Sequence, residues 1–163
     1  MKRIKFMTVA LMACLMLSGC GGNNSSDGSD SNSTASVPEI KTIAERTETL
    51  LNDVEFPEMV EVLDSNLSAF YGIDAADVTE FSAYLNGAGA YPDQFGIFVA
   101  TDADAAARIE ERLNEYIEKQ KGVFADYTPA EMYKFDDCFV SVNANNVSFA
   151  VCADNQTAKD ILG

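Results

Sequence analysis

Cys20 is the residue of this 163-residue sequence whose chemistry is most clearly defined by its neighbours. It ends the run Leu17-Ser18-Gly19-Cys20, after a charged head and an apolar segment, and these are the parts of an export signal. Leu, Ser and Gly before a cysteine are typical of the lipoprotein variant, in which the thiol takes a diacylglycerol and a peptidase cuts just before it. The sequence therefore predicts lipidation at Cys20 and a bacterial protein anchored by lipid at the outer face of the plasma membrane.

Two other interpretations of this segment are an uncleaved membrane helix and an ordinary cleaved signal in which Cys20 is incidental. The apolar stretch 8–17 is much shorter than the roughly 20 residues that a membrane-spanning helix needs. The match at each position before Cys20 favours the lipoprotein over the ordinary signal. We therefore assign residues 1–20 to a lipoprotein signal peptide.

The remaining side chains offer little to a catalyst. The sequence has no His, which removes the commonest general base and the commonest metal ligand. After the signal only Cys138 and Cys152 remain as thiols, and neither has a His to activate it. No catalytic residue and no cofactor is predicted. A hydrolase that uses two carboxylates stays an alternative, although 26 acidic residues make some close pair inevitable.

Four aspartates are the candidates for a divalent cation. Asp102 and Asp104 form one pair and Asp136 and Asp137 another, and carboxylate oxygens are ligands that Ca²⁺ prefers. A run of alanines follows Asp104, where a calcium loop would place another ligand and a glycine. Helix capping explains the first pair and a solvated turn the second. No metal site is therefore assigned, and a cation-binding module stays an alternative function.

Three aromatic residues around a glycine-rich loop are the candidates for recognition: Tyr84, Tyr91 and Phe95. The loop 86–93 lies between two predicted strands, and aromatic side chains on a mobile loop beside a rigid sheet suit a binding surface. The alternative is that Phe95 belongs to the core and Tyr91 covers an edge of the sheet.

The charge of the chain after Cys20 is strongly negative, with 8 basic against 26 acidic side chains. This field repels nucleic acid and anionic lipid head groups, so no nucleic-acid partner is expected. It attracts cations or basic partners, or it serves only to keep an exported protein soluble.

The domain organisation follows from composition. Residues 21–36 contain no large apolar side chain and are predicted to be a flexible tether of Ser, Asn, Gly and Asp. Residues 37–163 are expected to form one domain. Its first helix is predicted to start at Ser36, where Ser36-Val37-Pro38-Glu39 has the pattern of a capping box, and to end before Pro57. A short helix over 67–71, capped by Asp64, is expected to stop at Gly72.

Two strands and a long helix are predicted around the aromatic residues. Alternation over 78–85 predicts a strand with Phe81, Ala83 and Leu85 inward, and a second strand covers 95–100. The apolar stripe from Ala106 to Phe124 predicts a long amphipathic helix. It is expected to open within Thr101-Asp102-Ala103-Asp104, with Asp or Thr at the cap, and to be broken by Tyr127-Thr128-Pro129.

Two more strands, 138–143 and 147–152, are predicted to form a hairpin. With Ala144-Asn145 as the turn, Val142 faces Val147, Val140 faces Phe149 and Cys138 faces Val151. This register places Cys138 and Cys152 on opposite faces, so both thiols are expected to be unpaired. Residues 157–162 are expected to form a closing helical turn.

These elements predict an α+β fold with two layers. A mainly antiparallel four-stranded sheet is expected to pack against one long amphipathic helix, with further helices at the N-terminus.

Several short segments in this order resemble a known family. They are Phe56-Pro57-Glu58-Met59, Phe70-Tyr71-Gly72-Ile73-Asp74, Asp93-Gln94-Phe95-Gly96-Ile97-Phe98 and Tyr127-Thr128-Pro129. The order is similar to that of the domain-of-unknown-function family numbered four-three-five-eight, small lipoproteins found mainly in Gram-positive anaerobes. The resemblance covers about residues 40 to 162 and implies a lipid-anchored extracytoplasmic domain with no assigned activity. Gln94 stands where the family tends to have Glu, and Ala144 where it tends to have Gly.

The sequence favours one function over the alternatives. We expect a binding or accessory module at the cell surface that engages a protein, peptide or envelope component, with membrane attachment through the lipid on Cys20. It does not indicate the partner or the oligomeric state.

Overall fold

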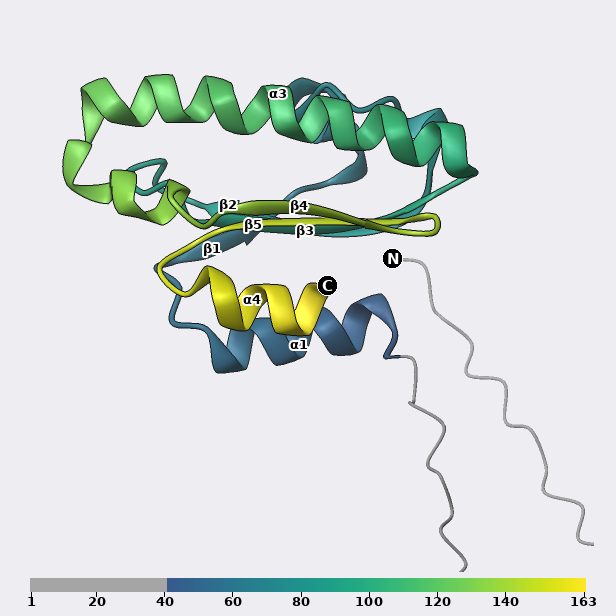
Figure 1. Cartoon of the computed structure of the whole chain (residues 1–163), viewed down its shortest axis with the longest axis horizontal. Coiled ribbons are helices and arrows are strands. Elements are labelled where there is room, and N and C mark those ends of the chain that lie inside the picture. The colour runs from purple at the N-terminus through teal and green to yellow at the C-terminus, as the bar shows by residue number, and fades with distance from the viewer. Residues whose placement is uncertain (1–40) are drawn as a thin grey trace, which may run out of the picture. The chain divides into compact units, whose positions relative to one another are not determined.

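The computed structural model describes residues 41–163 (Figure 1). Cys20, the signal peptide, the tether and Ser36 lie outside the described residues. The helices are α1 (Ile43–Asp53), α2 (Leu67–Tyr71), α3 (Ala103–Tyr127) and α4 (Asn155–Leu162), and the strands are β1 (Met59–Glu61), β2 (Val78–Asn86), β3 (Gln94–Ala100), β4 (Phe139–Asn143) and β5 (Asn146–Val151). Three 3₁₀ segments connect them: η1 (Asp64–Asn66), η2 (Ala75–Asp77) and η3 (Pro129–Phe135). Within this part of the chain, no helix combines the length and apolarity needed to cross a membrane.

The strands form one antiparallel sheet in the order β1-β2-β3-β5-β4. The predicted α+β class, with a long helix against an antiparallel sheet, is confirmed. The sheet has five strands rather than four, because β1 pairs with β2 from Met59↔Asn86 to Glu61↔Tyr84. Three residues are too few to show an alternation in the sequence, so the pattern did not predict this strand.

Helices cover both faces of the sheet, so the fold has three layers rather than two (Figure 1). Helix α3 packs on one face, where Leu113, Phe98 and Phe149 are fully buried. Helices α1 and α4 lie on the other face, where the buried cluster includes Leu50, Phe95, Ile97 and Leu162. Strand β3 is therefore buried on both sides, and Phe95 and Phe98 belong to different cores.

Helix α1 starts at Ile43 and not at Ser36. Lys41 and Thr42 are not helical, and the Thr42 side chain accepts a hydrogen bond from the Glu45 backbone N–H while Glu45 accepts one from the Thr42 N–H. This Thr-x-x-Glu pattern is the same capping box that the sequence offers at Ser36. The second copy of the pattern is the one that caps the helix.

Helix α3 agrees with its prediction. The Asp102 carboxylate accepts a hydrogen bond from the Ala105 N–H at 2.8 Å, and the helix ends just before Thr128 and Pro129. Five of its six buried residues, Ala106, Ile109, Leu113, Ile117 and Phe124, follow the predicted stripe, and the sixth is Ala105. Helix α2 likewise stops at Gly72, whose φ is 70°, although η1 precedes it and Asp64 makes no capping hydrogen bond.

The β4–β5 hairpin has the predicted register, with Val142 opposite Val147 and Val140 opposite Phe149. Its turn carries a residue with positive φ, Ala144 at 52°. Cys138 contacts the core under α3, while Cys152 belongs to the core under α1 and α4. Both thiols are free, which confirms the prediction that they do not pair.

Candidate functional site

The three aromatic residues predicted for recognition do not form one surface. Phe95 is fully buried and stacks on Tyr84, with ring centroids 5.3 Å apart, and Tyr84 is itself partly buried in the same core. Phe95 therefore cannot contact a partner, because helices α1 and α4 cover the sheet face to which it points. Tyr91 is 45% exposed and is the one member of the set that presents much of its ring to solvent.

Beside Tyr91 lies Lys134, a buried lysine from η3. Its ammonium is 2.6 Å from Asp93 Oδ2 and 2.8 Å from Glu131 Oε2, and the Lys134 and Asp93 side chains are only 8% and 1% exposed. The same ammonium lies 5.4 Å from the centroid of the Tyr91 ring and 5.9 Å from that of Tyr133. We call Tyr91 and Tyr133 the tyrosine pair.

The charges of this cluster follow from burial and pairing. Burial lowers the pKa of Lys134, but the hydrogen bond from Lys134 to Asp93 and its contact with Glu131 outweigh burial and raise it, so the ammonium stays charged. Burial raises the pKa of Asp93 more than Lys134 lowers it. Asp93 Oδ1 is buried with no hydrogen-bond partner among the described residues, so this carboxylate depends on Lys134 for its charge compensation.

Hydrogen bonds from two asparagine side chains hold the backbone of the segments that carry the tyrosine pair. The Asn86 amide donates to the Glu58 carbonyl at 2.9 Å and accepts from the Ala90 and Tyr91 N–H groups at 3.0 and 3.3 Å. Hydrogen bonds of Asn86 thus restrict the loop 86–93, which the sequence predicts to be long and mobile. On the other side, the Asn155 amide donates to the Lys134 carbonyl at 2.7 Å, which ties η3 to the start of α4.

The sequence patterns do not indicate Lys134 or Tyr133 as functional residues. Both come from η3, which the sequence shows only as the break after α3. A signal was present in Tyr133-Lys134-Phe135, where a lysine lies between two aromatic residues. The buried partner of Lys134 is Asp93, which is far away in the sequence, so no local sequence pattern indicates this pairing.

The aspartates and thiols that the sequence offers as candidate metal ligands or nucleophiles are placed in ways that do not favour these roles. Asp102 caps α3, and Asp136 and Asp137 are exposed before β4. Residues 41–163 hold no group of three or more His, Cys, Asp or Glu side chains placed to bind a metal ion. Burial raises the pKa of the Cys152 thiol to about 12, and burial also raises that of Cys138. Neither thiol is therefore primed as a nucleophile at neutral pH.

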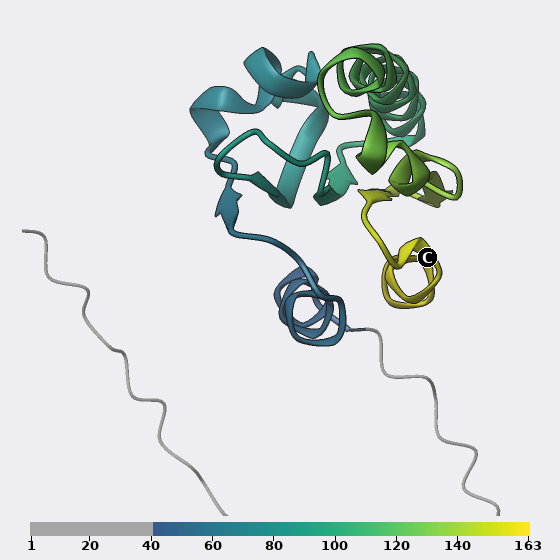
Figure 2. The ribbon, with the colours of Figure 1, turned by 90° about the vertical axis from the view of Figure 1, so that its left-hand side faces the viewer.

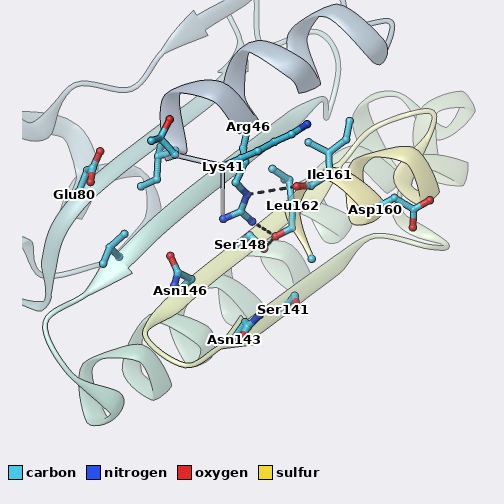
Figure 3. A pocket seen from close by; sticks show the side chains of 14 residues that line it. Lys41, Arg46, Glu80, Ser141, Asn143, Asn146, Ser148, Asp160, Ile161 and Leu162 are labelled. Atoms are coloured by element: carbon cyan, nitrogen blue, oxygen red, sulfur yellow. Dashed lines mark hydrogen bonds between the residues drawn. The ribbon is translucent and has the colours of Figure 1, made fainter. Parts of the chain in front are cut away.

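A groove of about 730 Å³ lies between α1, α4 and the sheet face near the β4–β5 turn (Figure 3). Arg46 Nε donates to the Ile161 carbonyl at 3.4 Å, and Arg46 Nη2 donates to the Leu162 carbonyl. Ser148 Oγ donates to the same Leu162 carbonyl at 3.1 Å. Arg46 therefore completes the C-terminus of α4, which is a structural role. We call this space the α1–α4 groove; its polar lining includes Glu80, Ser141, Asn143, Asn146 and Asp160.

Comparison with known proteins gives one match. No curated protein and no solved structure matches the chain. The model of the family described as Domain of unknown function (DUF4358) matches residues 52–152, a range that includes all five strands, α3, Asp93, Lys134 and the tyrosine pair. The match agrees with the resemblance drawn from the sequence. The chain therefore belongs to the domain-of-unknown-function family DUF4358.

Proposed function

We propose that this protein is a lipid-anchored binding module at the outer face of the plasma membrane, and that it engages a protein, peptide or envelope component through the tyrosine pair. The observation that carries the proposal is the exposure of two rings beside one buried ammonium. Tyr91 is 45% exposed and Tyr133 is 54% exposed, while Lys134 between them is buried. The contact surface is thus a pair of aromatic side chains with a fixed support.

Such a pair has the properties of an interface anchor. Tyrosine has few rotatable bonds and a large contact area, and it is enriched among the residues that dominate binding energy. A cation beneath each ring contributes about 0.5–2 kcal/mol and restricts the ring, which lowers the entropy lost on binding. The hydrogen bonds of Asn86 and Asn155 also restrict the backbone at Tyr91 and at Lys134, next to Tyr133.

The acidic groups nearest to the tyrosine pair support binding over hydrolysis. Both carboxylates, Asp93 and Glu131, lie within 3 Å of the Lys134 ammonium, at 2.6 and 2.8 Å. The Asp93 side chain is only 1% exposed, so a substrate in solvent cannot reach this carboxylate as a general base.

The support for a membrane anchor comes from the sequence that precedes the domain. In this proposal the Leu17-Ser18-Gly19-Cys20 run directs lipid attachment to Cys20, and a tether of sixteen residues would span about 20–25 Å at roughly 5–6 Å × √n. The module would thus work close to the membrane surface without inserting into it.

Capture from the cell envelope tests this function. The chain from residue 20 onward, with Cys20→Ser to remove the lipid, is immobilised and exposed to envelope extracts of the bacterium that makes it. Tyr91→Ala/Tyr133→Ala is compared with Phe70→Ala/Tyr127→Ala, which also removes two exposed aromatic side chains, at 45% and 68% exposure. We expect one partner to be captured by the parent and the control, and its affinity to fall about 30-fold or more in Tyr91→Ala/Tyr133→Ala.

The proposal fails if the two double variants capture the same material to the same extent. It also fails if the loss follows only from unfolding, which the thermal transition of each variant reveals.

A further inference from the structure

Strand β4 is one edge of the sheet, and its outer side is open. In the sheet order β1-β2-β3-β5-β4, no described strand follows β4. The pairing of β4 with β5 determines which of its N–H and C=O groups point away from the sheet. Because the Ala100 N–H donates to the Asn145 carbonyl, the odd residues of β5 bond to β3, and its even residues bond to β4.

This alternation leaves two residues of β4 facing outward. Phe139, Ser141 and Asn143 pair with the even residues of β5, so the N–H and C=O groups of Val140 and Val142 point away from the sheet. None of the hydrogen bonds found in residues 41–163 outside regular elements engages these four groups. Val142 is 40% exposed, which places its outer backbone within reach of another chain.

The two edges of the sheet differ in how they are protected. Natural edge strands are blocked by charged side chains, proline or very short length. Strand β1 has two of these features, because it is three residues long and contains Glu61. Strand β4 has the sequence Phe-Val-Ser-Val-Asn, with no charge and no proline. The β4 edge is therefore the one that remains able to accept another strand.

The surroundings of β4 select the charge of its partner. Asp136 and Asp137 are exposed at the start of the strand, and Asp160 lines the α1–α4 groove together with Ser141 of β4 (Figure 3). Among the nearby cations, Lys121 is paired with Glu118 at 2.7 Å, Arg46 donates to the Ile161 and Leu162 carbonyls, and Lys41 also lines the groove. Residues 41–163 carry 8 basic and 23 acidic side chains, so a second copy of this chain would be repelled.

We propose that β4 is a docking edge for an extended, positively charged segment of another protein, which joins the sheet as a sixth strand. The backbone of that segment would bond to Val140 and Val142. Its side chains would alternate between Val140 and Val142 on one face and Ser141 and Asn143 at the groove on the other. This surface is separate from the tyrosine pair and goes beyond the function proposed above.

Amide hydrogen exchange with a defined peptide tests the proposal. The probe is an octapeptide of alternating Lys and Val, and the matched control is the alternating Glu–Val octapeptide, both added to the Cys20→Ser chain from residue 20 onward. We expect the Lys–Val peptide to slow exchange at the Val140 and Val142 amides about tenfold at nine-tenths occupancy, because bound molecules are protected. The Glu–Val peptide should leave both rates unchanged.

Two variants separate strand addition from general charge attraction. Val142→Pro removes an outward N–H that β5 does not use, so the hairpin should persist while protection at Val140 is lost; Val142→Thr keeps the N–H and should behave like the parent. Asp136→Asn/Asp137→Asn changes only exposed groups and should weaken the binding of the Lys–Val peptide.

Three results would overturn the proposal: protection elsewhere but not at Val140 and Val142, equal protection by both peptides, or protection that grows with protein concentration without peptide. The last result would assign the edge to a second copy of the chain.

Discussion

Lys134 is a charged residue in a place where water cannot compensate it. Its partners are Asp93 from the β2–β3 loop and Glu131 from its own 3₁₀ segment, so one ammonium connects two parts of the chain that are far apart in sequence. The same ammonium supports the tyrosine pair from beneath. At the scale of single residues, the stability of the site and the position of its contact surface therefore depend on the same group.

Lys134→Met tests this dependence. Methionine fills the space but leaves the Asp93 carboxylate buried without compensation, and breaking such a buried pair costs about 3–5 kcal/mol in the free energy of unfolding. Urea unfolding at neutral pH gives the value. The double variant Asp93→Asn/Lys134→Met is the control, because it removes both charges, and we expect it to recover most of the loss.

The same variant has a distinctive pH dependence. Burial raises the pKa of Asp93, and without Lys134 the pKa rises further, so the folded state of Lys134→Met binds a proton that the unfolded state releases. Its stability relative to the parent should therefore recover as the pH falls toward the ordinary pKa of Asp and worsen as the pH rises. A loss that does not change with pH would mean that packing, rather than the uncompensated carboxylate, causes it.

At the scale of elements, the sequence predicts what is local and periodic. The stripe of α3, the start of this helix within residues 101–104 and the register of the β4–β5 hairpin follow from spacings within a few residues of one another. Strand β1, the coverage of the sheet by α4 and the position of Lys134 depend on contacts between distant segments. The start of α1 was ambiguous for another reason, because two equivalent capping boxes precede it.

The turn of the β4–β5 hairpin provides a test at this scale. Ala144 has a φ of 52°, and the left-handed region costs a residue with a Cβ atom roughly 1–2 kcal/mol. Ala144→Gly removes this cost but adds freedom to the unfolded chain, so we expect a net stabilisation of about 0.5–1 kcal/mol. Thermal or urea unfolding measures it.

The matched control is Ala107→Gly, on the exposed face of α3. There the same substitution lies in a helix interior and should destabilise the protein by about 1 kcal/mol. If both substitutions destabilise equally, the backbone of Ala144 is not strained as the turn geometry implies.

At the scale of the whole molecule, residues 41–163 form one acidic, three-layer domain, on which we propose two distinct places for contact. The tyrosine pair belongs to the β2–β3 loop and η3. The open edge lies along β4, and helices cover the two faces of the sheet (Figures 1 and 2). From its charge we expect the acidic surface to disfavour self-association and nucleic acid and to favour basic partners. Composition alone predicted this charge, whereas only the folded chain identifies which surfaces stay open.

Crosslinking on intact cells tests the central claim most directly. A photoreactive benzoylphenylalanine replaces Tyr133 in the full-length protein, or replaces Phe70, which is an equally aromatic residue at 45% exposure. After illumination, we predict a discrete adduct with an envelope partner from position 133 that is absent from position 70. Equal adducts from both positions, or none from position 133, would contradict the assignment of the tyrosine pair as the binding surface.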